Sequence, residues 1–77
     1  MHGISLAAAE MLLAGFTEEW IDKRRDYRET RIIAIGEIGG REFVCVYTRR
    51  GVAFRPISLR PANRKERDVY QNAKAGR

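Results

Sequence analysis

The chain has 77 residues, fewer than the roughly 100–200 of a typical domain, so we expect a single domain over residues 1–77 with a thin core. Hydrophobic residues make up 44% of the sequence and charged residues 32%, which favours a folded chain over a disordered one. The one cysteine, Cys45, excludes an internal disulfide and a zinc site made of several cysteines of one chain. No apolar run approaches the ~18–20 residues that span a bilayer, and no Lys or Arg precedes the first apolar stretch. We therefore expect a cytoplasmic protein that is neither secreted nor inserted in a membrane.

Positive charge is concentrated in the second half of the chain. The net charge is +5, but residues 1–40 carry five basic and seven acidic side chains, whereas residues 41–77 carry ten and three. Such a basic segment is typical of proteins that bind a polyanion, and RNA or DNA is the first candidate. The alternatives are a solvated surface without a specific partner, and an acidic N-terminal half that faces a basic protein.

The first predicted element is a helix over residues 5–14. Ser5 is a favourable N-cap residue, and Gly15 suits the position that ends a helix. Apolar residues at helical spacing would line one of its faces: Leu6, Ala9, Leu12 and Leu13.

Residues 16–30 are polar and show no clear periodicity. We expect Trp20 and Ile21 to tie this stretch to the core.

Three strand signals follow, separated by short turns. The predicted strands are residues 31–37, 42–48 and 52–60. Gly39-Gly40 is a two-residue hairpin signal, and Arg49-Arg50-Gly51 supplies the second tight turn. The expected sheet is a three-stranded antiparallel meander.

The second of these strands is predicted to be central. Residues 43–47 are all apolar, which indicates a strand covered on both faces and makes Cys45 a small buried hydrophobe. In the third strand, Pro56 has no N–H to donate to a ladder, so it indicates an edge strand or a bulge.

The last predicted element is a helix over residues 64–73. Asn63 and Glu66 have the spacing of a capping box. The apolar contacts of this helix would be Val69, Tyr70 and Ala73. A short helix with so few apolar residues depends on tertiary packing, so it could exchange with a partner. The predicted fold is α+β, a meander with an N-terminal and a C-terminal helix.

These segments together form a pattern. One strand contains Ala34-Ile35-Gly36, the next ends in Tyr47-Thr48, and the third ends in Ile57-Ser58-Leu59-Arg60. The helix that follows carries Arg64, Glu66 and Arg67 and reaches Tyr70, and His2-Gly3-Ile4-Ser5 leads into the first helix. On these residues the chain resembles the BrnT family of bacterial toxins over almost its whole length, apart from residues 16–25.

The resemblance implies a RelE-like fold and a ribonuclease toxin of a type II toxin–antitoxin system. It also implies a cognate ribbon-helix-helix antitoxin, similar to BrnA. The family pattern has a further strand and a basic helix before the His-Gly step, so we expect an N-terminally short domain with an open sheet edge. Strand addition by a partner, or self-pairing into a homodimer, would cover that edge.

Metal-independent RNA cleavage needs a base for the 2′-OH, cations for the phosphorane and an acid for the leaving 5′ oxygen. The sequence has no carboxylate cluster that indicates a metal, and we expect no metal and no other cofactor. Arg60 ends the third strand, Arg64 and Lys65 open the last helix, and Arg67 lies one turn beyond Arg64. Because a helix N-terminus favours anions, these four side chains are predicted to form a phosphate-binding cluster.

We name Arg60, Tyr70 and His2 as candidate catalytic residues. Arg60 would clamp a phosphate with its planar guanidinium, or else lie on the surface over Tyr70 or the sheet. Tyr70 would stack on a base or donate a proton, or else pack in the core with its hydroxyl on Glu66. His2, the only histidine, is the candidate general acid or base, and Glu66 is assigned mainly to the helix cap.

Two other classes of function stay open beside the ribonuclease toxin that binds RNA. One is a non-catalytic nucleic-acid-binding module, or a toxin remnant that only pairs with an antitoxin. The other is a structural interaction domain that strand addition completes.

Overall fold

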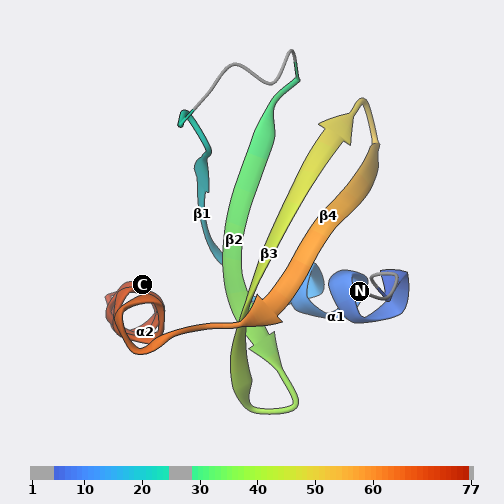
Figure 1. Cartoon of the computed structure of the whole chain (residues 1–77). Helices are drawn as coiled ribbons and strands as arrows, with labels where there is room; N and C mark the ends of the chain where they lie inside the picture. Colours follow the sequence, from blue (N-terminus) through green and yellow to red (C-terminus); the bar gives the residue numbers. More distant parts are fainter. Residues whose placement is uncertain (1–4, 25–28, 77) are drawn as a thin grey trace.

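The computed structural model describes residues 5–24 and 29–76 (Figure 1). The elements in chain order are α1 (Leu6–Ala14), β1 (Glu18–Ile21), β2 (Arg31–Ile38), β3 (Arg41–Arg50), β4 (Ala53–Pro61) and α2 (Arg64–Ala75). The strands form one antiparallel sheet in the order β1-β2-β3-β4. The α+β class and the meander are confirmed, but the sheet has four strands, so the prediction of three was wrong.

The additional strand, β1, comes from the stretch that shows no periodicity. It has only four residues, which pair with β2 so that Trp20 lies opposite Ile33. Such a short segment carries too little pattern to be predicted, and its conformation is fixed by the neighbouring strand. Trp20 is 42% exposed and Ile21 is 52% exposed, so the prediction that they tie this stretch to the core was wrong. Backbone pairing and the buried Asp22, whose N–H donates to the Arg31 carbonyl, hold it instead.

The first predicted turn is confirmed, and the second lies later in the chain than predicted. Gly39 and Gly40 have φ of +58° and +83°, as a two-residue turn between β2 and β3 requires. The strand β3 continues through Arg50, so the second turn consists of Gly51 and Val52, with φ of +58° at Gly51. Arg49 and Arg50 thus belong to the strand and not to the turn.

Pro56 lies on an edge strand and at a bulge, as predicted. β4 is the last strand of the sheet, and its register against β3 shifts between Val46 and Tyr47. Val46 pairs with Ser58 and Tyr47 pairs with Pro56, which leaves Ile57 as the extra residue.

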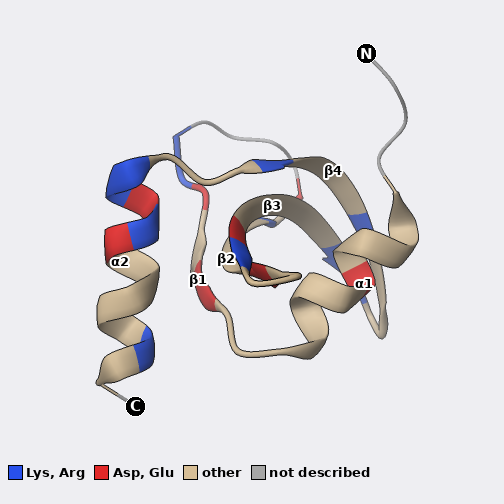
Figure 2. Cartoon of the chain, turned by 90° about the horizontal axis from the view of Figure 1, so that it is seen from below, with Lys and Arg blue, Asp and Glu red and all other residues tan. Residues whose placement is uncertain are grey.

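The helices cover opposite faces of the curved sheet (Figure 2). On one face, the buried Leu12 of α1 packs against Ala34 and Cys45. Gly36 allows this approach, because a Cβ atom there would lie 2.9 Å from Leu12 Cγ. Leu6, by contrast, is 53% exposed, so its predicted place on the packed face of the helix was wrong.

On the other face, α2 packs through Tyr70. This side chain contacts a core of Ile35, Val44 and Ala62. Lys74 adds an ion pair of 2.8 Å with Glu37 at the end of β2. Val69 is 40% exposed, so its predicted contribution to the packed face was wrong. No helix in the described parts of the chain is long and apolar enough to cross a membrane.

Candidate functional site

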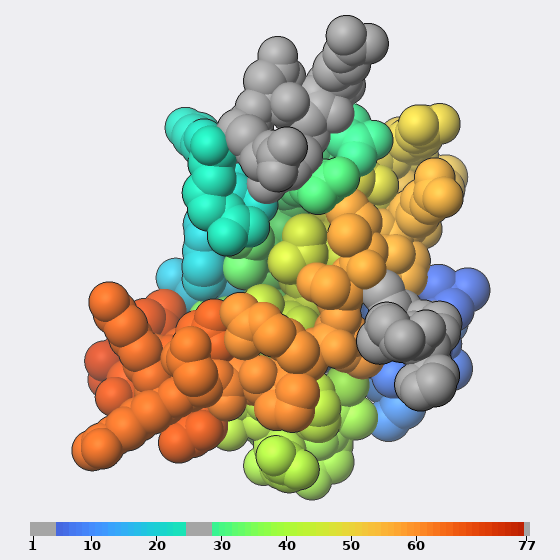
Figure 3. Space-filling model, viewed as in Figure 1, coloured from blue at the N-terminus to red at the C-terminus, as the bar shows by residue number. Residues whose placement is uncertain are grey.

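The face of the sheet that carries α2 has its side chains arranged in rows. Residues paired across an antiparallel ladder point to the same face, so the strand register defines these rows. The near row, beside α2, is Glu18, Ile35, Val44 and Arg60; the middle row is Trp20, Ile33, Val46 and Ser58; the far row is Arg31, Thr48 and Arg55. We call Arg60 with the middle and far rows the open face. In Figure 3, α2 lies across the lower left, strand residues form the surface above it, and α1 is visible only at the right margin.

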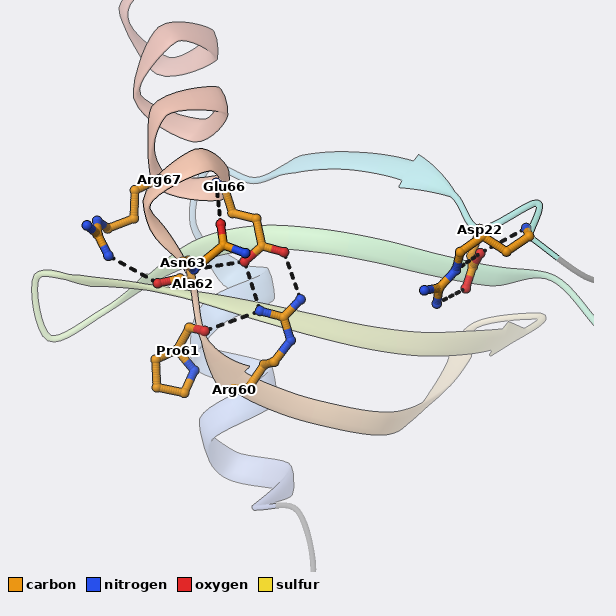
Figure 4. Close-up of polar contacts among 8 residues, drawn as sticks. Asp22, Arg60, Pro61, Ala62, Asn63, Glu66 and Arg67 are labelled. Atoms are coloured by element: carbon orange, nitrogen blue, oxygen red, sulfur yellow. Dashed lines mark hydrogen bonds and ion pairs between the residues drawn. The ribbon is translucent and has the colours of Figure 1, made fainter.

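Arg60 is held in place by the first turn of α2. Its Nη1 and Nη2 donate to the two carboxylate oxygens of Glu66 at 2.8 and 2.7 Å, and Nη1 also donates to the Pro61 carbonyl (Figure 4). The same carboxylate accepts the backbone N–H of Asn63 at 2.8 Å, completing a capping box. The hydrogen bonds from Arg60 hold the pKa of Glu66 below its ordinary value. The predicted cap is therefore confirmed, and Glu66 has a second role, since it orients Arg60.

This arrangement leaves one edge of the Arg60 guanidinium available. Arginine has five N–H donors in one plane, and the bonds to Glu66 and Pro61 use three of them. Within residues 5–24 and 29–76, no acceptor is bonded to the Nε–H or to the second proton of Nη2. Because 52% of the side chain is exposed, this edge can donate two parallel hydrogen bonds to a phosphate.

The other predicted phosphate ligands are spread around the start of α2. Arg64 and Lys65 are exposed on its first turn. Arg67 donates from Nη1 to the Ala62 carbonyl at 3.2 Å, and Figure 4 shows its guanidinium on the opposite side of the chain from that of Arg60. Arg67 and Arg60 thus do not converge on one pocket.

Tyr70 has the structural role that the sequence left open. Its side chain is 2% exposed, so a base cannot stack on the ring in this conformation. The ring packs on Phe16 with centroids 5.7 Å apart, and the hydroxyl donates to the Phe16 carbonyl at 3.4 Å and not to Glu66. Burial raises the pKa of this hydroxyl. Tyr70 therefore positions α2, and with it Glu66, against the sheet.

The far row lines a hollow that the sequence did not reveal. It has a volume of about 400 Å³, and its walls are Glu29, Arg31, Thr48, Arg55, Pro56 and Ile57. An adjoining hollow of about 100 Å³ shares Thr48 and Arg55 and adds Arg50. The alternation of side chains along β3 and β4 was a signal for this site, but the bulge at Ile57 obscured which residues of β4 share a face with Thr48.

The middle row contributes an exposed aromatic ring. Trp20 lies at its β1 end, next to Ile33, and is 42% exposed. Indole rings on an open sheet can stack on unpaired bases. Basic side chains of the near and far rows lie on either side of this apolar middle row.

Two further predictions concern His2 and metal binding. His2 lies outside the described residues. Among the described residues, no group of three or more His, Cys, Asp or Glu side chains is placed to hold a metal ion.

The sequence of the chain matches a known protein family. A family model described as the ribonuclease toxin BrnT of type II toxin–antitoxin systems matches residues 1–66. The chain belongs to this family. Searches of curated proteins and of solved structures found no match.

The open face lies within the region of the chain that matches the BrnT family. The family is one of ribonuclease toxins, and a type II system pairs such a toxin with a cognate antitoxin. The matched region contains the whole sheet, Arg60 and Glu66, so the near, middle and far rows all lie within the part of the chain that defines the family.

Proposed function

We propose that the open face binds single-stranded RNA and that Arg60 takes part in metal-independent cleavage of the bound strand. The observation that carries this proposal is the geometry of Arg60: Glu66 and Pro61 fix the guanidinium, and its Nε–Nη2 edge stays open to a phosphate. Charge develops on the phosphate oxygens as the 2′ oxygen attacks, and an oriented donor pair stabilises that charge without reorganising. Unpaired bases would lie over the middle row, where Trp20 offers a ring to stack on.

The remaining predicted residues have defined parts in this proposal. Arg64, Lys65 and Arg67 attract the RNA backbone to the start of α2. His2 serves as the general acid or base, and Tyr70 is a positioning residue that does not touch the substrate. The protein would act in the cytoplasm.

The test is cleavage of a long single-stranded RNA in the presence of EDTA. We expect the wild-type chain to cleave it, and we expect Arg60→Gln to remove cleavage while the chain stays folded by circular dichroism. Arg41→Gln is the matched control, because it removes the same charge from the other face, where Arg41 lies over Phe43. Loss of cleavage in EDTA, or equal activity of the two variants, would contradict the proposal.

The cognate antitoxin is proposed to be a ribbon-helix-helix protein that covers the open face. A partner there would bury the exposed Trp20 and neutralise the basic rows. We expect RNA and the co-expressed antitoxin to compete for the toxin, and Trp20→Ala to weaken both interactions. Simultaneous binding of the two would place the antitoxin elsewhere.

A second candidate is binding without cleavage, with the chain acting as a remnant that pairs with an antitoxin. The pairing of Arg60 with Glu66 favours binding without cleavage, because the carboxylate offsets the charge of the guanidinium. Salt-dependent binding of intact RNA would be its signature.

Both edges of the sheet are poorly suited to the predicted strand addition and to a homodimer formed by strand pairing. β1 has four residues, and β4 contains Pro56 and Pro61. A short edge and prolines both oppose pairing with another strand. We therefore propose that any partner docks mainly on the open face.

A further inference from the structure

We infer that the far row, Arg31–Thr48–Arg55, is a second phosphate subsite, so that tight binding requires an RNA strand long enough to reach both this row and Arg60. This inference rests on the proposed function and adds to it a minimum length of substrate. It assigns a ligand to the hollow on the open face that is remote from α2.

The row has the geometry of an anion cradle. Thr48 is 4% exposed and forms the floor, with Arg31 opposite it on β2 and Arg55 opposite it on β4. Adjacent strands lie ~4.8 Å apart, so the two arginine Cα atoms are about 10 Å apart with the threonine between them. Two arginine side chains whose Cα atoms are about 10 Å apart can bring their guanidinium groups to one phosphate above the threonine hydroxyl. The hollow of about 400 Å³ lies among these side chains.

The charges of the lining favour a phosphodiester over a neutral ligand. Glu29 lies 3.5 Å from Arg31 Nε and offsets part of its charge. Arg55 is exposed, and its side chain forms no ion pair within residues 5–24 and 29–76. Arg50 adds a further positive charge from the adjoining hollow. Counted over the described residues, the lining therefore carries a net positive charge. Arg55 is the side chain whose replacement tests the subsite best.

The distance between the two sites sets the length of RNA. Val44 in the near row and Thr48 in the far row are four residues apart on β3, which corresponds to about 14 Å at ~3.4 Å per residue. A stacked strand advances ~3.4 Å per nucleotide, so about four nucleotide steps, which join about five successive phosphates, cover this distance, and fewer do if the bases are splayed. The middle row with Trp20 lies under the nucleotides in between.

The inference predicts a threshold in binding against RNA length. Fluorescein-labelled oligoribonucleotides of two to eight residues, with 2′-O-methyl groups that block cleavage, would be titrated with the wild-type chain and followed by anisotropy. We expect affinity to rise steeply until about five or six nucleotides and then to level off. Arg55→Gln should weaken binding of the octamer about 5- to 10-fold and weaken binding of the dinucleotide much less, because only the longer strand needs both subsites at once, whereas the dinucleotide can still bind at Arg60.

Two comparisons make the test specific. Arg41→Gln removes an equal charge from the opposite face and should change octamer binding less than twofold, while Arg55→Lys should restore most of the loss. The salt dependence of octamer binding should also fall by about one counterion in Arg55→Gln.

The outcomes separate this inference from the function it rests on. Suppose that the wild-type chain cleaves long RNA, but Arg55→Gln binds oligonucleotides of every length as tightly as Arg41→Gln does. The inference of a second subsite is then wrong, and the proposed function stands. If the wild-type chain binds no oligonucleotide and cleaves no RNA, both are wrong.

Discussion

The contact between Glu66 and Arg60 gives the sharpest test of how stability and activity are linked in this fold. Replacing Glu66 by Gln keeps a side-chain oxygen that can accept the Asn63 N–H, so the helix cap survives. It removes the charged pair with Arg60, whose bonds are 2.8 and 2.7 Å long. The variant therefore separates the orientation of Arg60 from the capping of α2.

The expected loss of stability is about 0.5–1 kcal/mol. Exposed ion pairs are worth about 0.2–1 kcal/mol, and the upper part of that range applies because this pair is bidentate. A larger value is unwarranted, since the Arg60 side chain is 52% exposed and water screens the interaction. In Glu66→Ala the lost cap adds about 0.5–1 kcal/mol. For a domain of this size, 1 kcal/mol lowers the melting temperature by about 4–8 °C.

The assay combines urea unfolding, followed by circular dichroism, with RNA cleavage. A double-mutant cycle of Glu66→Gln and Arg60→Gln isolates the pair, and we expect a coupling free energy of about 0.5–1 kcal/mol. In Glu66→Gln we also expect kcat to fall while RNA binding is kept or tightened, because Arg60 loses its orientation and a nearby negative charge disappears. A coupling near zero together with unchanged kcat would refute the reasoning.

Four further predictions follow from the structure. The pKa of Glu66 is held below its ordinary value of 4.5, so its contribution to stability is full above that pH and disappears as the pH falls through the lowered value; acid titrations should show this loss in the wild type and not in Glu66→Gln. Gly36→Ala should cost about 1–3 kcal/mol in urea unfolding, because the new Cβ would lie 2.9 Å from the buried Leu12, whereas Gly15→Ala, which meets no atom within 4 Å, should cost far less. Tyr70→Phe should keep RNA cleavage if Tyr70 only positions α2, and a loss of kcat without a loss of stability would make its hydroxyl catalytic. Trp20→Ala should weaken RNA binding by about 1–3 kcal/mol while the melting temperature stays within a few degrees, and unchanged binding would remove the middle row from the interface.

The sequence predicted those parts of the fold that local chemistry determines. The glycine turn at Gly39 and Gly40, the capping box of α2 and the bulge near Pro56 each need particular residues at particular positions, and all three are present. β1 could not be predicted, because its Glu-Glu-Trp-Ile segment becomes a strand only by pairing with β2.

The candidate site was predictable in its residue types and not in its arrangement. The sequence named Arg60 as a candidate, but the open edge of its guanidinium depends on the contact with Glu66, which no spacing reveals. The far row joins residues from three strands, and the bulge shifts which residue of β4 lies beside Thr48. Tyr70 has the spacing of a site residue, yet its contacts with Phe16 and Ile35 bury it.

Glu66 both caps α2 and orients Arg60, so the arginine can be oriented only after α2 has been synthesised. Arg60 is translated before α2, and the carboxylate that orients it belongs to that later helix. A nascent chain whose sheet has already formed would carry this arginine in an unconstrained state. The oriented guanidinium forms only when the following segment has left the ribosome and coiled. Under the proposed function, a product truncated before α2 would therefore lack the oriented donor pair that contacts the phosphate.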